Sequence, residues 1–177
     1  MRVFYGLIIT AVILMIGACA LKAYKKEGAL ARVVFLYELG AFICGIIFLV
    51  YTYVPGTTIT VLCKGLIMAS FDWLLILLMY YTQYYTGMFK GIVGVKVFMI
   101  AYSLLETVAF LINTWTRWIF DITYISDDQI IVQFAKGNVL GRLHYVFAYG
   151  IMLLLILSYI VTVSYTHLRA HETSAHL

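Results

Sequence analysis

Five apolar stretches, each about as long as a bilayer-crossing helix, dominate this sequence. They cover residues 3–21, 33–54, 59–81, 92–112 and 143–163. A helix needs about 20 mostly apolar residues to cross the hydrocarbon core, because it rises only about 1.5 Å per residue. The composition agrees, since 64% of the residues are hydrophobic and only 11% are charged. The sequence therefore predicts an all-α integral membrane protein with a five-helix transmembrane bundle.

Basic residues collect around two of the connecting loops and predict the orientation of the chain. Loop 22–32 contains Lys22, Lys25, Lys26 and Arg32, and loop 87–91 contains Lys90 and is followed by Lys96. By the positive-inside rule, both loops are expected to be cytoplasmic, with the N-terminus and segment 113–142 outside the cell membrane. These membrane-flanking lysines account for the net charge of +4, so no nucleic-acid partner is predicted.

Alternating apolar residues within segment 113–142 predict a small extracytoplasmic β-hairpin between the fourth and fifth helices. Ile122 and Tyr124 precede an acidic centre at 126–129, and Ile130, Val132 and Phe134 follow it. Because two strands alone are marginally stable in water, we expect the hairpin to pack on the helix ends or on the membrane surface.

Ionisable side chains within the spans are the main candidates for function, because each is costly unless it is paired or hydrated. Counted from the predicted helix ends, Lys64 and Glu106 lie at matched depths of about 8 and 9 Å. We therefore predict an ion pair between Lys64 and Glu106, with Arg142 and His144 near enough to extend it. A polar contact that only fixes helix packing is the structural alternative.

Two further carboxylates, Glu38 and Asp72, fall in the inner half of the predicted spans, where no basic side chain lies. Three arrangements remain open for them. They bind a cationic group, share a proton, or accept hydrogen bonds from hydroxyls such as those of Ser70 or Tyr102.

Searches for catalytic and metal-binding patterns predict no enzyme activity, cofactor or metal for this chain. Cys19, Cys44 and Cys63 lie within spans at no metal-like spacing. No nucleophile elbow, zinc-protease motif or phosphate-binding glycine loop is present.

Residues 164–177, SYTHLRAHETSAHL, depart from the pattern before them. His167 and His171 are four residues apart, but no buried ligand accompanies them. The string resembles translated sequencing-adapter DNA. We therefore expect a non-native tail and a natural chain that continues differently after Val163.

Three aromatic and polar stretches carry a family resemblance. They are Phe71-Asp72-Trp73-Leu74-Leu75 with Tyr80-Tyr81-Thr82 and Tyr85-Thr86-Gly87; Leu111-Ile112-Asn113-Thr114-Trp115 with Ile119-Phe120-Asp121-Ile122; and Leu143-His144-Tyr145 with Tyr149. Through them, residues 30–163 resemble the N-terminal seven-helix transmembrane sensor region of bacterial histidine kinases and GGDEF diguanylate cyclases.

The resemblance implies that the chain holds the first five of seven helices of a sensory, signal-input module. The output domain, a kinase or a diguanylate cyclase, lies beyond this chain, and the whole protein is expected to form a homodimer. The stimulus is an unidentified small molecule or a change in the lipid bilayer. The expected signal site comprises Lys64, Glu106, Arg142 and His144, with Asn113, Trp115 and Trp118 at its rim. A small transporter or channel subunit that uses Asp72 and Glu38 is the alternative function.

Overall fold

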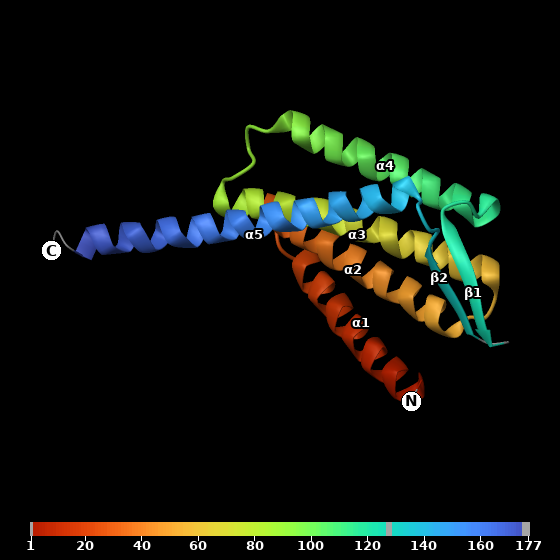
Figure 1. Cartoon of the computed structure of the whole chain (residues 1–177). Coiled ribbons are helices and arrows are strands. Elements are labelled where there is room, and N and C mark those ends of the chain that lie inside the picture. Colours follow the sequence, from red (N-terminus) through yellow and green to blue (C-terminus); the bar gives the residue numbers. More distant parts are fainter. Residues whose placement is uncertain (1, 127–128, 175–177) are drawn as a thin grey trace.

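The computed structural model describes residues 2–126 and 129–174, with side chains placed for residues 4–123 and 131–164. Five helices and two strands follow one another along the chain (Figure 1). They are α1 (Arg2–Tyr24), α2 (Ala29–Tyr53), α3 (Thr57–Thr86), α4 (Val93–Thr116), β1 (Phe120–Ser126), β2 (Gln129–Phe134) and α5 (Val139–Ser174).

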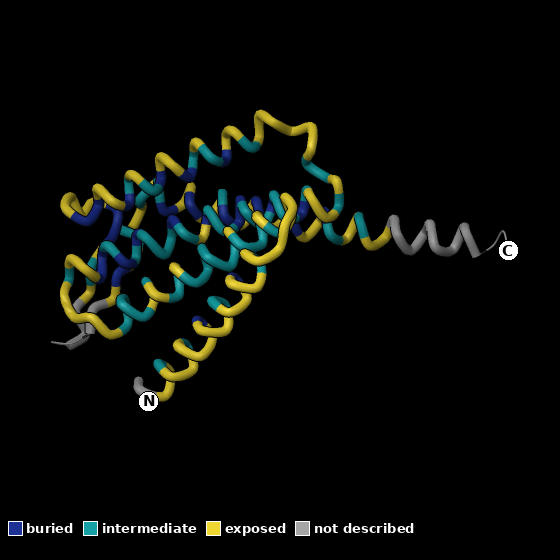
Figure 2. Tube along the Cα trace, turned by 180° about the vertical axis from the view of Figure 1, so that it is seen from behind, coloured by how far each residue is buried: buried dark blue, intermediate teal, exposed yellow. Residues whose placement is uncertain are grey.

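The five predicted spans are all helical, and each helix is long and apolar enough to cross a membrane. Their outer faces are apolar as well. On α1, Phe4, Leu14 and Met15 are 65–68% exposed, and exposed residues predominate along this helix in Figure 2. Exposed apolar surface on this scale is unfavourable in water and favourable in lipid. These features suggest a multi-pass membrane protein.

The helices extend further than the apolar stretches predict. Helix α3 continues to Thr86 and ends at Gly87, whose φ of 76° is the left-handed conformation that glycine adopts easily. Helix α4 continues to Thr116, and the backbone N–H of Arg117 donates to the carbonyl of Asn113 at 2.9 Å. The segment outside the helices is therefore 117–138, shorter than the expected 113–142.

Neighbouring helices approach closely where one of them has a glycine. A Cβ atom on Gly45 of α2 would lie 2.7 Å from Ile13 on α1, and one on Gly65 of α3 would lie 3.1 Å from Phe110 on α4. Small residues at such crossings let helix backbones approach closely, which is a common basis of packing within membranes. Helix α5 packs on α3 through Ala148, and its C-terminal part runs beyond the other helices (Figure 1).

The segment between α4 and α5 forms an antiparallel strand pair at one end of the bundle (Figure 1). Ile122 is paired with Val132, and Phe120 with Phe134. Phe120 and Val132 are buried against Phe110 of α4. The strands therefore cover the ends of α3 and α4. The acidic turn residues 127–128 lie outside the described residues.

Candidate functional site

Each of α3, α4 and α5 has a buried face that contains one ionisable residue. The buried positions recur every three or four residues, which is the spacing of one side of a helix. They are Ala69, Asp72, Leu75, Ile76 and Met79 on α3; Met99, Ser103, Glu106 and Phe110 on α4; and His144, Ala148, Ile151 and Leu155 on α5. Helical periodicity therefore turns Asp72, Glu106 and His144 into the bundle.

These three side chains meet, and we refer to them as the Asp–Glu–His cluster. The Nδ1 atom of His144 lies 3.3 Å from Oε1 of Glu106 and 3.4 Å from Oδ2 of Asp72. Asp72 is 0%, Glu106 1% and His144 3% exposed. The hydroxyl of Tyr102 donates to Oε1 of Glu106 at 3.4 Å. One cluster thus links three helices that are separate in sequence.

Several polar atoms of the cluster are buried without a hydrogen bond to any described residue. They are Oδ1 and Oδ2 of Asp72, Oε2 of Glu106 and Nδ1 of His144. The imidazole nitrogen is close to both carboxylates but is aligned for a hydrogen bond with neither. Because nearly all buried polar groups in proteins are satisfied, four such atoms together call for a further partner, such as a water molecule or an ion.

Apolar side chains close the cluster on two sides. Toward the hairpin, the rings of Phe110 and Phe134 each lie 5.8 Å from the ring of His144. Toward the other end, Leu75 and Ile76 of α3 pack with Met99 of α4 and with α5 residues. Figure 2 shows this buried zone where α3, α4 and α5 face one another. The cluster is therefore a polar site within an apolar bundle.

The predicted ion pair between Lys64 and Glu106 is not formed, because Glu106 faces His144 and Asp72 instead. Lys64 is half-buried and takes part in no ion pair with the described residues. The depth estimate placed Glu106 too near the helix end, since α4 continues to Thr116.

The helix ends are staggered, and for this reason depths counted in residues from each helix end do not predict which side chains meet. Asp72, Glu106 and His144 lie about 22, 15 and 8 Å along their helices from the ends on the hairpin side, yet their side chains meet. Depth counted from each helix end is therefore not depth in the bundle.

The other predicted residues lie away from the cluster or have structural roles. Arg142 is exposed, and its guanidinium donates to the carbonyl of Gly137 at 3.0 Å. Glu38 is half-buried on α2 and takes part in no ion pair with the described residues. Trp115 and Trp118 are 78% and 57% exposed.

Asn113 has a structural role at the end of α4. Its Oδ1 accepts a hydrogen bond from the backbone N–H of Ile119 at 2.8 Å, and the residue is fully buried. It therefore holds the turn into β1 rather than the rim of a signal site.

The sequence predicted that Glu106 and His144 lie near each other but did not predict Asp72 as their neighbour. Ser103 was also not predicted, and its buried hydroxyl has no hydrogen-bond partner among the described residues. The helical spacing of Asp72 with Ala69 and Ile76 was the available signal, because it places Asp72 on the buried face of α3. The side chains of His167, His171 and His176 lie outside the described residues.

Comparison with known proteins returned no protein-family model, curated protein or solved structure that matches this chain.

Proposed function

We propose that this chain is a membrane-embedded signal-input module of a bacterial signalling protein. The observation that supports it is the Asp–Glu–His cluster, which links α5 to α3 and α4. Helix α5 is also the last helix before position 164, after which the natural chain is expected to continue differently. A change at the cluster therefore has a direct mechanical connection to the part of α5 near Val163.

The proposed mechanism is a shift between two packings of α5. Below the cluster, α5 rests on α3 through apolar contacts of Ala148, Ile151 and Leu155, and Thr82 of α3 donates a hydrogen bond to the hydroxyl of Tyr159 at 3.4 Å. When the stimulus changes the charge or ligation of the cluster, the preferred position of His144 changes, and α5 moves with it. Signalling of this kind is a coupling between two states and needs no chemistry in the chain itself.

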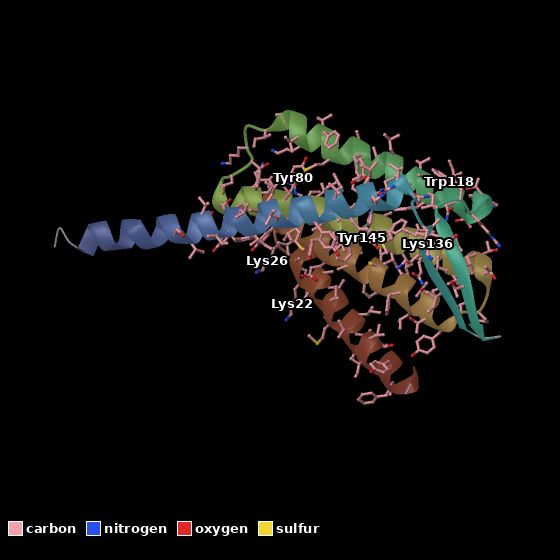
Figure 3. All side chains as sticks on the ribbon, viewed as in Figure 1. Lys22, Lys26, Tyr80, Trp118, Lys136 and Tyr145 are labelled. Atoms are coloured by element: carbon pink, nitrogen blue, oxygen red, sulfur yellow. The ribbon has the colours of Figure 1, made fainter. Side chains whose placement is uncertain are left out.

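The orientation in this proposal follows from the basic loops. Figure 3 shows Lys22 and Lys26 near the end of the bundle from which α5 projects, and Lys136 near the hairpin. With the basic end in the cytoplasm, α5 points toward a cytoplasmic output domain and the hairpin faces outward. The sequence resemblance favours a histidine kinase or a diguanylate cyclase as that output, working as a homodimer.

A distance measurement between α4 and α5 tests the proposed function. Spin labels are attached at Val97 of α4 and Val163 of α5, which are 60% and 55% exposed, after Cys19, Cys44 and Cys63 are replaced by alanine. We expect Glu106→Gln to shift the distance distribution in lipid nanodiscs. Glu38→Gln, an intramembrane carboxylate outside the cluster, is the matched control and should leave it unchanged. Identical distributions for the parent and Glu106→Gln would count against a signal-input module.

The same buried carboxylates favour a second candidate function, a small ion transporter or channel subunit. Ionisable groups inside a membrane bundle are common on ion pathways. A flux assay in proteoliposomes separates the two functions, because a signal-input module moves no ions. Ion flux that is abolished by Asp72→Asn would establish the transporter instead, and loss of flux in Glu38→Gln would place Glu38 on the ion pathway as well.

A further inference from the structure

We infer that the Asp–Glu–His cluster binds one divalent transition-metal ion, with Asp72, Glu106 and His144 as its protein ligands. Binding of the ion does not depend on the proposed signalling function. The further point that the ion is the stimulus, or sets the resting position of α5, rests on the proposed signalling function.

The donor atoms are those that such ions prefer. One imidazole nitrogen and two carboxylates are offered, and the ligand atoms all lie within 4.8 Å of one another. Zn²⁺ binds His nitrogen at about 2.0–2.1 Å and carboxylate oxygen at about 2.0–2.2 Å. Imidazole favours zinc, iron, nickel or copper over the hard cations Ca²⁺ and Mg²⁺, which are bound mainly by oxygen.

Two of the three distances between ligand atoms match those around an ion and are longer than those of a charge-assisted hydrogen bond. Two ligand atoms around a tetrahedral Zn²⁺ are about 3.3 Å apart, given these bond lengths. The cluster has 3.3 Å between His144 and Glu106 and 3.4 Å between His144 and Asp72. A charge-assisted N–H···O hydrogen bond is shorter, at about 2.7–2.9 Å. The missing hydrogen-bond alignment of Nδ1 is also expected when its lone pair points at an ion.

Charge gives a separate argument. Among the described residues, the carboxylates of Asp72 and Glu106 form ion pairs only with His144. A protonated imidazole carries a single positive charge and therefore neutralises one carboxylate at most. A divalent ion bound to a neutral imidazole neutralises both and also gives a partner to Oδ2 of Asp72 and Nδ1 of His144.

The surroundings resemble the outer shell of a metal site. The Tyr102 hydroxyl donates to Glu106, as outer-shell groups do when they orient a ligand. Ser103 lies one turn before Glu106 on the same face of α4, with a buried hydroxyl that has no partner among the described residues. The rings of Phe110 and Phe134 cover the site on the hairpin side.

Equilibrium dialysis against Zn²⁺, with bound metal counted by mass spectrometry, tests the inference. The protein is purified in detergent without a polyhistidine tag and stripped with a chelator. His167, His171 and His176 are replaced by alanine in every sample, so that the tail binds no metal. We expect one Zn²⁺ per chain. We expect Asp72→Asn, Glu106→Gln and His144→Gln each to weaken binding by at least about 10-fold, and the matched control Glu38→Gln to bind like the parent.

Cobalt substitution provides a second readout that a purely structural role for the cluster does not produce. Co²⁺ bound by nitrogen and oxygen ligands has characteristic visible absorption bands, which should be present in the parent protein and in Glu38→Gln but absent in His144→Gln. Thermal unfolding shows whether each variant is folded. Added Zn²⁺ should raise the melting temperature of the parent and of Glu38→Gln, in which the site is intact, but not that of His144→Gln.

The inference is overturned if the parent binds no Zn²⁺, or if Glu38→Gln loses as much binding as Glu106→Gln. The spin-label experiment keeps this outcome separate from the proposed function. If the parent binds one Zn²⁺ but Glu106→Gln leaves the distance between α4 and α5 unchanged, the metal site is retained and the signalling role is rejected. If the parent binds no Zn²⁺ but Glu106→Gln shifts the distance, the signalling role is retained and the metal site is rejected.

Discussion

Asn113 shows how a single buried amide shapes the end of the bundle that covers the cluster. Its side-chain oxygen accepts the backbone N–H of Ile119, while its backbone carbonyl accepts the N–H of Arg117. Arg117 adopts a φ of 54°, which ends α4 and reverses the chain. As a result, Ile119 and Phe120 enter the apolar core beside Phe110.

Replacing Asn113 with alanine is expected to destabilise the protein by about 1–3 kcal/mol, because the N–H of Ile119 would be left buried without an acceptor. Thr116→Ala, at an exposed position on the same helix end, is the matched control and should change stability by less than about 0.5 kcal/mol. The free energy of unfolding in a denaturing-detergent titration measures both. Equal effects of the two substitutions would show that the amide does not hold the turn.

At the scale of elements, α3 is the central helix of the bundle, because three of the other helices pack against it. It packs against α2, α4 and α5, and β2 covers part of it. Small residues make this possible, since Gly65 lets the backbone of α4 come close at Phe110. The N-cap of α5 adds to the arrangement, because Oδ1 of Asn138 accepts the N–H of Gly141 at 3.2 Å and starts the helix beside the hairpin.

Gly65→Ala should destabilise the contact between α3 and α4. The added Cβ would lie 3.1 Å from Cβ and 3.3 Å from the carbonyl oxygen of Phe110, so the α4 backbone would have to move. Overpacking of this kind costs about 1–3 kcal/mol. Gly150→Ala is the matched control, because nothing lies within 4 Å of that Cβ and alanine favours a helix. Thermal unfolding in detergent should rank Gly65→Ala below the parent and Gly150→Ala level with it or above it.

At the scale of the whole molecule, the two ends of the bundle differ in charge and in structure. The basic residues of loops 22–32 and 87–91 lie at the end where α5 projects, and the strand pair covers the opposite end (Figures 1 and 3). The apolar outer faces of the helices lie between these ends. This asymmetry supports the proposed orientation, with the hairpin end outside the cell.

Cysteine labelling in intact cells tests that orientation. Lys26→Cys and Lys136→Cys are made in a background without native cysteines, and both positions are exposed. A membrane-impermeant maleimide should label Lys136→Cys in intact cells and label Lys26→Cys only after the membrane is permeabilised. The opposite pattern would place the hairpin in the cytoplasm and α5 pointing outward.

The sequence by itself determined the elements. Length and hydropathy predicted all five helices, because the hydrocarbon thickness and the helix rise set the same requirement for every span. The alternation around Ile122 and Val132 likewise corresponds to the strand register, since side chains of a strand point alternately to its two faces. These features depend on neighbouring residues along the chain.

Only the tertiary structure decided which ionisable residues meet. Asp72, Glu106 and His144 come from three helices whose ends are staggered, and the rotation of each helix about its own axis selects Asp72 over Lys64. Both quantities depend on packing between helices, such as the close approach of Phe110 to the backbone of Gly65. Packing between segments far apart in sequence leaves little local signal beyond helical spacing, so the meeting of Asp72 with Glu106 and His144 became evident only in the assembled bundle.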